Sequence, residues 1–258
     1  MQNKEISSEN LYISTAFLYD FDNRDLLNYD VELCLKYINQ TRGDILEMAC
    51  DTGRITIPVL ENAGGRSVTA FDLSDTMLEV FREKISSSAY MGNLRLEKAN
   101  MADFDFSQKF GLIILVWRAF QCLINEEDAK SCLQCVKNHM DASSIFLFSI
   151  FLPRESYGAD WLGKENISYE AADPQTGNEI KRWTKNLKSD EEAQVIEYAS
   201  IYEITGSGGN KNRLEDRITC KYYYPEQIKQ LLADCGFTVV MEYTTDTDLF
   251  LTLKAEGN

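Results

Sequence analysis

Two acidic residues stand near the ends of two successive apolar runs of the chain. Glu47 lies in the run over residues 44–48, which is followed by a small-residue turn over residues 49–53. Asp72 ends the run over residues 67–71, nineteen residues after Gly53. In a doubly wound sheet, such a turn lets a cofactor approach the backbone, and an acid at the tip of the next strand accepts hydrogen bonds from ribose hydroxyls. The two segments therefore predict a site for an adenosine-containing cofactor.

Alternating strands and helices are predicted around these residues. The almost continuous apolar run over residues 110–117 is expected for a parallel strand buried on both faces, and Ser74 is a good N-cap for an amphipathic helix. The expected strands are residues 44–48, 67–71, 94–98, 110–117 and 143–151, and the expected helices are residues 23–38, 54–63, 75–85 and 126–140. This alternation favours an α/β fold.

The pattern changes after Pro153. Residues 180–187, 194–205 and 213–222 alternate polar and apolar side chains, which predicts a three-stranded antiparallel meander. A helix over residues 225–232 and strands over residues 237–243 and 249–253 then resume the earlier pattern. The expected fold is α/β, a doubly wound, mostly parallel, seven-stranded Rossmann-like sheet with an inserted antiparallel β-meander. Its expected parts are an N-terminal helical cap (1–43), a cofactor-binding core (44–153), an inserted meander or substrate lid (154–223) and a C-terminal completion of the core sheet (224–258).

The composition limits the kinds of partner that this protein is expected to bind. The chain of 258 residues carries a formal charge of −15, which disfavours nucleic acid and anionic membranes as partners. No secretory signal or membrane span is expected from the sequence. The seven cysteines have no disulfide-framework spacing, so we expect reduced thiols and a cytoplasmic protein. Cys132 and Cys135 form a CxxC pair inside a helical pattern, and no metal site is expected there. The only histidine, His139, is expected to be structural or exposed to solvent.

Four segments in order resemble the class I S-adenosylmethionine-dependent methyltransferases, specifically a small bacterial branch that acts on metabolites. They are residues 45–57 (ILEMACDTGRITI), 68–78 (VTAFDLSDTML), 100–104 (NMADF) and 110–121 (FGLIILVWRAFQ). The likeness covers about residues 19–153 and returns at residues 224–240. The resemblance implies S-adenosylmethionine as the cofactor and in-line methyl transfer to a small molecule. The acceptor is left open as an amine, hydroxyl or carboxylate on a metabolite or sugar-like compound, and the protein is expected to be a monomer or homodimer.

The resemblance also implies roles for single residues. Glu47 and the turn residues Ala49, Asp51 and Gly53 would hold the methionine half and ribose, and Asp72 would bind both ribose hydroxyls. The remaining expected cofactor contacts are Leu73 and Met77 around the adenine, Asn100 and Met101 at its edge, Val116 at the methionine end, and Tyr19, with Tyr12 nearby, closing over the cofactor. Tyr19, Arg118 and Gln121 are the catalytic candidates near the methyl group. Six aromatic residues of the insert are further candidates to shape the acceptor pocket: Tyr157, Trp161, Tyr169, Trp183, Tyr222 and Tyr223.

Two departures from the family pattern leave alternatives open. Ala49 and Asp51 replace two glycines of the turn, and glycine there permits positive φ and close approach of the cofactor. Asp51 therefore motivates a second hypothesis, a methyltransferase-like binding or scaffold protein with impaired catalysis. Cys122 stands where the related pattern commonly has a histidine, so one candidate base is missing. A nicotinamide-dependent oxidoreductase is a weaker third hypothesis, since the turn lacks G-x-G-x-x-G.

Overall fold

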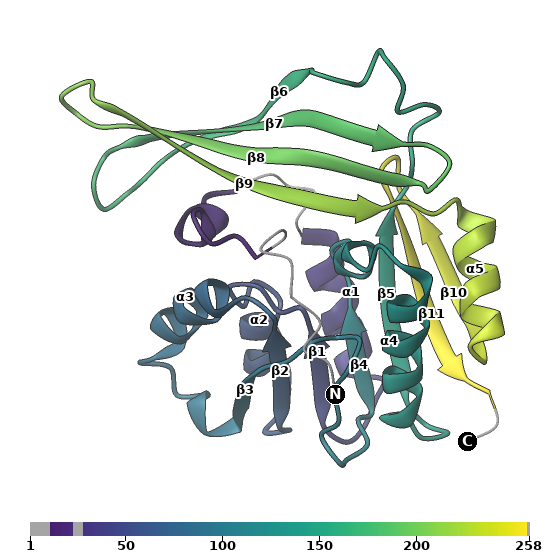
Figure 1. Cartoon of the computed structure of the whole chain (residues 1–258). Coiled ribbons are helices and arrows are strands. Elements are labelled where there is room, and N and C mark those ends of the chain that lie inside the picture. The colour runs from purple at the N-terminus through teal and green to yellow at the C-terminus, as the bar shows by residue number, and fades with distance from the viewer. Residues whose placement is uncertain (1–10, 23–27, 257–258) are drawn as a thin grey trace.

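A seven-stranded sheet forms the centre of the computed structural model, which describes residues 11–22 and 28–256. Its strand order is β10-β11-β5-β4-β1-β2-β3. Strands β1 to β5 pair in parallel, whereas β11 is antiparallel to both β5 and β10. The bounds are β1 (Ile45–Met48), β2 (Val68–Asp72), β3 (Leu94–Lys98), β4 (Leu112–Leu115), β5 (Ile145–Phe151), β10 (Phe237–Thr244) and β11 (Asp248–Ala255). The predicted seven-stranded, mostly parallel sheet is confirmed (Figure 1).

Helices cover both faces of this sheet. Strands β1, β2 and β4 are buried along their whole length, as expected for central parallel strands. Alternate residues of β1 enter different cores, with Leu46 in one cluster and Ile45 in the other. The first cluster is closed by α4 (Glu126–Asn138) and α5 (Pro225–Asp234), and the second by α1 (Asn28–Ile38), α2 (Thr56–Asn62) and α3 (Asp75–Ile85).

The N-terminal part contains a short 3-10 helix, η1 (Ala16–Phe21), before α1. Leu18 of η1 packs in a small apolar cluster with Tyr169 and Tyr202 of the insert, so this segment lies between the insert and the core. The predicted helix over residues 23–38 is observed from Asn28 onward, and residues 23–27 lie outside the described residues.

The insert is a four-stranded antiparallel sheet, and the prediction of three strands was wrong. It has the order β6 (Glu165–Ala172), β7 (Glu179–Asp190), β8 (Val195–Thr205) and β9 (Lys211–Lys221). The missed strand, β6, is an edge strand with mostly exposed side chains. A register shift lies between Ile167, which is 54% exposed, and Tyr169, which is 7% exposed, so these two apolar residues do not share a buried face. A short edge strand with such a bulge buries too few apolar residues on one face to give a strong strand signal in a sequence.

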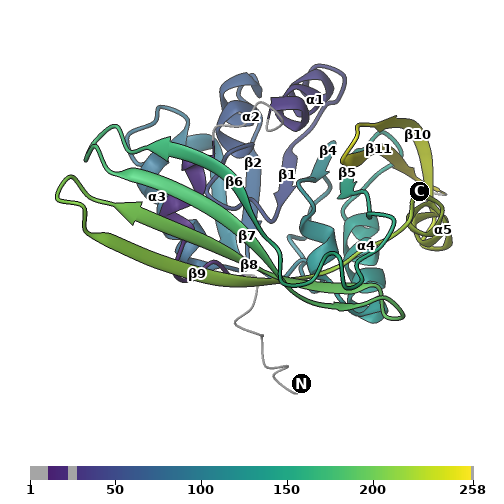
Figure 2. The same cartoon turned by 90° about the horizontal axis from the view of Figure 1, so that it is seen from above.

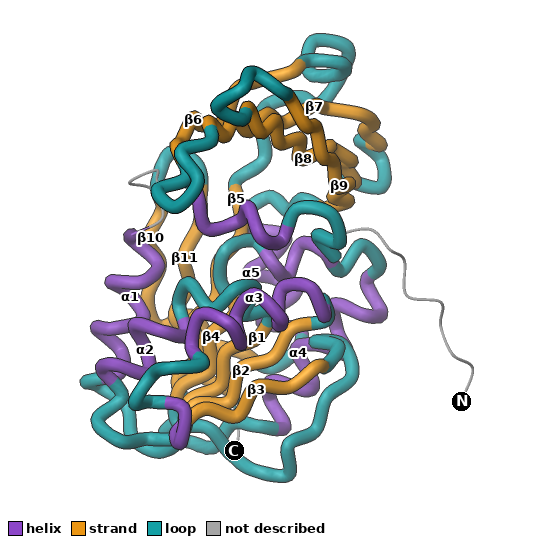
Figure 3. The backbone as a smooth tube through the Cα atoms, turned by 90° about the vertical axis from the view of Figure 1, so that its left-hand side faces the viewer, coloured by secondary structure: helices purple, strands orange, loops and turns teal. Residues whose placement is uncertain are grey.

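This four-stranded sheet lies over the ends of the strands of the seven-stranded sheet, and we call it the lid. Figure 1 shows it above the end toward which β5 points, and Figure 3 shows the same two layers from the side. Seen from above, the lid strands cross the molecule from the side of α3 toward α4 (Figure 2). Within the described part of the chain, no helix has the length and apolar character needed to cross a membrane.

Candidate active site

A cavity of about 1150 Å³ lies between the lid and the edge of the core sheet. It is lined from three directions: the loops after β1, β2, β3 and β4, the segment around η1, and the inner face of the lid. A site for one drug-sized ligand usually measures about 300–1000 Å³. The cavity is therefore large enough for two small molecules side by side.

The turn after β1 has the left-handed backbone of a glycine-rich turn, although its sequence contains few glycines. Ala49, Asp51 and Gly53 all have left-handed backbone, with φ of 53°, 48° and 82°. Asp tolerates this region better than most residues, and alanine accepts it at a modest cost. A Cβ on Gly53 would lie 2.4 Å from Cε2 of Phe81, so only this position requires the absence of a side chain. Glycines are thus dispensable at the two positions where this chain lacks them.

Asp72 anchors the turn from the neighbouring strand. Its Oδ2 accepts a hydrogen bond from the Asp51 amide at 3.0 Å, and its Oδ1 accepts one from the Ser74 amide at 2.8 Å. Asp72 is 8% exposed and lines the cavity. Burial raises the pKa of the Asp72 carboxyl, and the backbone amides oppose this rise. The carboxylate faces the cavity with lone pairs still available to a ligand.

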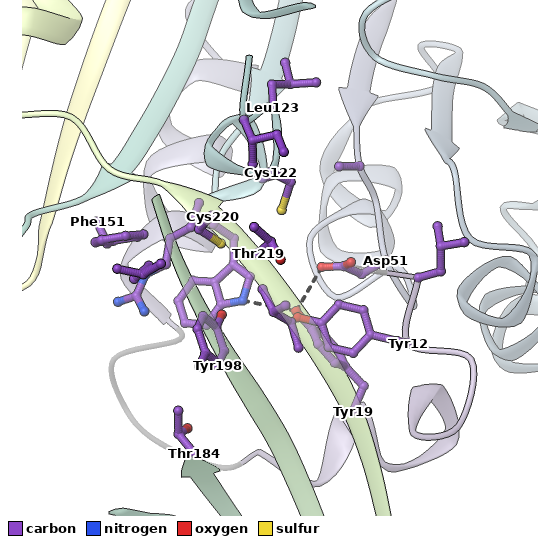
Figure 4. Close-up of a pocket in the computed structure, with 18 of the residues that line it drawn as sticks. Tyr12, Tyr19, Asp51, Cys122, Leu123, Phe151, Thr184, Tyr198, Thr219 and Cys220 are labelled. Atoms are coloured by element: carbon purple, nitrogen blue, oxygen red, sulfur yellow. Dashed lines mark hydrogen bonds between the residues drawn. The ribbon is translucent and has the colours of Figure 1, made fainter. Parts of the chain in front are cut away.

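A hydrogen-bonded chain links the N-terminal segment to this turn. Trp117 Nε1 donates to the Tyr19 hydroxyl at 3.2 Å, and that hydroxyl donates to Asp51 Oδ2 at 3.0 Å (Figure 4). Burial, followed by repulsion from Asp72, raises the pKa of the Asp51 carboxyl, and the Tyr19 hydrogen bond opposes the rise. Two carboxyl groups with raised pKa values therefore adjoin one another at the cavity wall.

The predicted cofactor residues divide into those that line the cavity and those that lie behind its wall. Tyr19, Ala49, Asp51, Asp72, Leu73, Asn100 and Met101 line it. Glu47, Gly53, Met77 and Val116 are not among the lining residues. Glu47 is buried behind the turn and accepts a hydrogen bond from the Thr56 hydroxyl at 2.6 Å. Its burial raises the pKa of its carboxyl to about 8, so it supports the turn mainly as a neutral acid.

Of the catalytic candidates, Arg118 lines the cavity and Gln121 does not. The Arg118 guanidinium donates to both carboxylate oxygens of Asp248, at 2.9 and 3.0 Å, so its charge is already paired. Gln121 is fully buried, and its side-chain oxygen accepts from the Phe151 amide at 2.7 Å, which gives it a structural role. Cys122, at the position of the missing histidine, lines the cavity. Hydrogen bonding with Cys220 and burial raise the pKa of the Cys122 thiol, so it is held neutral.

His139 has a structural environment, as the sequence suggested. Its ring is 2% exposed and stacks on Phe104 with 4.8 Å between centroids. Nδ1 lies 2.7 Å from the Cys135 carbonyl, to which it can only donate, and Nε2 accepts from the Phe106 amide at 2.9 Å. His139 does not line the cavity.

The lid supplies polar side chains that the sequence reasoning missed. Arg182, Thr184 and Asn186 of β7 line the cavity at alternate positions, and Asn166 and Ser168 of β6 join them. Figure 4 shows Thr184 and Tyr198 on the lid strands, across from Asp51 on the core side. Of the six aromatic candidates in the insert, Tyr157 and Trp161 line the cavity, whereas Tyr169, Trp183, Tyr222 and Tyr223 do not. The period-two pattern of β7 was the signal that could have identified the polar residues.

Comparison with known proteins agrees with this architecture. Residues 45–142 match a family model described as a methyltransferase domain. The chain is 26% identical over 214 residues to the candidate methyltransferase YqeM of Bacillus subtilis strain 168, covering 80% of this chain and 79% of that protein. A candidate methyltransferase of Geobacillus strain WCH70 is 23% identical over 244 residues, covering 91% and 92% of the two chains.

Solved structures share the fold over almost the whole chain. The CcbJ methyltransferase from Streptomyces caelestis aligns with a TM-score of 0.76 at 17% identity, covering 96% of this chain and 99% of that one. The sugar N-methyltransferase KedS8 from Streptoalloteichus aligns with a TM-score of 0.73 at 14% identity, covering 99% and 98%. An S-adenosylmethionine-dependent methyltransferase from Clostridium acetobutylicum aligns with a TM-score of 0.70 at 20% identity, covering 90% and 91%.

The fold is a doubly wound sheet with a cavity at the ends of its central strands, which is where such sheets bind ligands. The match over residues 45–142 shows a methyltransferase domain in this chain, and solved S-adenosylmethionine-dependent methyltransferases share the fold. The described residues fit that cofactor: the left-handed turn leaves its backbone open to the cavity, and Asp72 presents a carboxylate at the tip of β2. The adjoining carboxyl of Asp51 adds negative charge that favours a sulfonium and an ammonium group.

Proposed function

We propose that this methyltransferase acts on a small molecule. The acceptor would be held between the lid and the opposite part of the cavity, which contains Asp51 and Asp72 and is called the cofactor half. The observation that carries the proposal is the shape of the cavity: one continuous space of about 1150 Å³ is lined both by Asp72 and by the polar face of β7. A lid over the methyl-transfer position excludes a folded macromolecule more readily than a metabolite, because the acceptor must fit beneath it.

The residues that would hold the cofactor follow from their places in the cavity. Asp72 would accept hydrogen bonds from the ribose hydroxyls, and Leu73, Asn100 and Met101 would enclose the adenine. The turn residues Ala49 and Asp51 would receive the methionine half, with Tyr19 closing the site from the N-terminal side. Glu47, Gly53, Met77 and Val116 would support this surface from behind.

The chemistry asks little covalent participation from the protein. When bound, S-adenosylmethionine supplies an electrophilic methyl group on a sulfonium. The lid side chains, among them Tyr198 and Trp161, would orient the acceptor atom in line and keep water out of the cavity. Arg118, fixed by Asp248, would act as a rigid positioning residue, since its guanidinium is already paired.

An amine or hydroxyl on a sugar-like compound is the acceptor class that we favour. Two structures that share the fold are described as sugar N-methyltransferase KedS8 and as the amino pentose methyltransferase CalS10. The lid of this chain presents hydroxyl and amide groups at Ser168, Thr184 and Asn186, which suit a hydroxylated acceptor. A carboxylate acceptor is the remaining class to be tested.

Two measurements test the proposal. Calorimetry with S-adenosylmethionine and S-adenosylhomocysteine measures cofactor binding, and transfer of a tritiated methyl group to amino sugars, neutral sugars and sugar acids measures activity. We expect binding of both cofactor forms and transfer to one acceptor class. Absence of binding at millimolar ligand would contradict the cofactor assignment. Binding without transfer to any small molecule would contradict the acceptor assignment.

The alternative of a protein with impaired catalysis depends on Asp51. The left-handed backbone of Asp51 removes the steric part of that objection, and Asp51→Gly tests the electrostatic part. We expect this variant to bind the cofactor no more tightly than the natural chain, because Asp51 attracts the sulfonium. A large gain in affinity would instead identify Asp51 as an obstacle.

We also propose a cytoplasmic location and a monomeric or homodimeric state. All seven cysteines are free in the structure, in keeping with a reducing compartment. Light scattering after gel filtration measures the oligomeric state directly.

A further inference from the structure

Arg182 is the feature of the cavity that the proposed function leaves unexplained. It lies on the inner face of β7 and lines the cavity. Its Nε donates to the Ser200 hydroxyl at 3.1 Å, and its Cζ lies 5.8 Å from the centroid of the Tyr202 ring. These two contacts fix the base of the guanidinium. No other hydrogen bond of Arg182, and no carboxylate within 4.0 Å of it, occurs among residues 11–22 and 28–256.

The other cations of the cavity wall differ from it. Arg54 donates to both carboxylate oxygens of Asp30, at 2.9 and 2.5 Å, and Arg118 is held in the same way by Asp248. Arg154 also lines the cavity, but its side chain is exposed to solvent. Arg182 is therefore the partly buried cation of the described cavity wall that has no carboxylate partner.

A guanidinium in this situation is suited to a ligand anion. Partial burial removes water from the charge, and without a counter-charge this is unfavourable. Because Nε is already used, the two terminal nitrogens remain as a pair of parallel donors, which matches two oxygens of a carboxylate or phosphate. The opposite wall carries the acidic groups Asp51 and Asp72. The cavity thus has a negative cofactor side and a positive place in its roof.

The neighbours of Arg182 on the lid are also hydrogen-bonding groups. The Ser168 and Thr184 hydroxyls lie 3.1 Å apart, and both residues line the cavity from neighbouring strands. Hydroxyl donors next to an arginine provide further hydrogen bonds for an oxyanion.

We propose that Arg182 binds an anionic oxygen group, a carboxylate or a phosphate, on the methyl acceptor. The inference rests on the proposed function, because it names the substrate class of the same cavity. The preferred acceptors are then small molecules that carry a nucleophilic amine or hydroxyl at one end and an acidic group at the other. Arg182 is a specificity-determining residue and takes no part in the transfer itself.

The experiment compares matched neutral and anionic probes on protein saturated with S-adenosylhomocysteine. The probes are glucosamine, glucosamine 6-phosphate and muramic acid, together with inorganic phosphate, and tryptophan fluorescence reports their binding. Charge-assisted hydrogen bonds lead us to expect that one or both anionic probes bind about 30-fold more tightly than glucosamine. The phosphate and carboxylate arms identify which anion is preferred.

Three variants locate the effect. Arg182→Gln should abolish the preference for anionic probes, and Arg182→Lys should retain part of it because the charge remains. Arg213→Gln is the matched control, since it removes an arginine from the same lid at a position 53% exposed and outside the cavity. Thermal unfolding of each variant shows whether it remains folded.

The outcomes separate this inference from the proposed function. If S-adenosylhomocysteine binds all variants equally while Arg182→Gln alone loses the anion preference, the inference is supported. If the cofactor binds but neutral and anionic probes bind alike, or Arg182→Gln binds the anions as the natural chain does, Arg182 is only a packing residue and the inference is wrong. Loss of cofactor binding by the natural chain contradicts the proposed function and is measured independently of the phosphate titration.

Discussion

The two halves of the cavity are built in different ways. The cofactor half comes from short contiguous segments after β1, β2 and β3, and it presents a left-handed backbone turn and carboxyl groups to the cavity. The lid half comes from alternate residues of long antiparallel strands, and its polar groups are side chains of β6 and β7. The comparison teaches that the core half is suited to a constant ligand, whereas the lid can change specificity by single substitutions without disturbing the backbone.

The largest expected difference between the halves concerns Asp72. Asp72→Asn removes the negative charge that would accept hydrogen bonds from the ribose, and we expect an affinity for S-adenosylhomocysteine about 100-fold lower. Asp75→Asn is the control, because Asp75 begins α3 nearby and its side chain is 61% exposed. Calorimetry measures both. An Asp72→Asn variant that binds normally would show that the cofactor half lies elsewhere.

The second prediction concerns Glu47, which is buried behind the turn of the cofactor half, and the measured quantity is the stability of the folded protein. Its carboxyl has a pKa of about 8 in the folded protein against an ordinary value of 4.5, so its contribution to stability is present below pH 4.5 and is lost as the pH rises through about 8. Glu47→Gln imitates the neutral acid. We expect the stability of this variant, relative to the natural chain, to improve by about 2 kcal/mol between pH 5 and pH 7.

Chemical denaturation at the two pH values measures this difference. Glu61→Gln changes an exposed carboxylate of α2 and serves as the control. If Glu47→Gln shows the same pH dependence as the natural chain, Glu47 is ionised in the folded protein and supports the turn as a charge.

The sequence predicted the cofactor half much better than the lid. The segments around Asp51, Asp72 and Asn100 are local motifs, so their order along the chain implies their meeting at the ends of parallel strands. The same local reasoning also named Met77 and Val116, which are not among the residues that line the cavity. A residue that is close in sequence to a binding motif is also close to the site in space. The sequence motif does not say whether the side chain of that residue faces the cavity or the core.

The lid required information that local patterns do not contain. Arg182 and Ser168 come to the same cavity because β6 and β7 pair side by side in the lid and each strand turns alternate side chains inward. Gln121 is expected near the methyl group from the sequence, whereas in the structure its side-chain oxygen accepts a hydrogen bond from the Phe151 amide. Arg118, whose backbone is left-handed with φ of 69°, lines the cavity, whereas Gln121 does not.

The acidic wall of the cofactor half predicts pH-dependent binding. Burial raises the pKa values of both carboxyls, and repulsion from Asp72 helps to raise the pKa of Asp51 to about 7, so a protonated form of Asp51 is present at mildly acidic pH. A cationic ligand favours the ionised forms and releases a proton on binding. Affinity for S-adenosylmethionine should therefore rise about tenfold from pH 6 to pH 8, and less for S-adenosylhomocysteine, which lacks the sulfonium.

Asp51→Asn sharpens that prediction, because asparagine accepts the left-handed backbone and cannot ionise. We expect a much flatter pH profile in calorimetry, with proton release measured by comparing buffers of different ionisation enthalpy. Equal slopes for the variant and the natural chain would assign the titration to another group. Arg182→Gln should leave the slope unchanged, since it lies in the other half of the cavity.

Tyr19 joins the two halves and gives the smallest effect. Tyr19→Phe removes the hydroxyl that donates to Asp51 and accepts from Trp117 Nε1, while its ring can keep the edge-on contact with Tyr12 at 5.4 Å. One hydrogen bond to a partly buried group leads us to expect about threefold weaker cofactor binding at pH 7. The direction of the pH dependence is more informative than this magnitude. Because the Tyr19 hydroxyl opposes the rise in the pKa of Asp51, its loss should raise that pKa further and move the affinity profile toward higher pH.

The loss should consequently be smaller at pH 8.5, where Asp51 is ionised in both proteins, than at pH 7. Calorimetry at the two pH values measures this convergence, and Tyr90→Phe, at an exposed position outside the cavity, controls for the removal of a phenol. A deficit that is equal at both pH values would mean that Tyr19 contacts the cofactor directly and does not act through Asp51. The N-terminal segment would then belong to the cofactor half alone, and the lid would be the only part of the cavity that faces the acceptor.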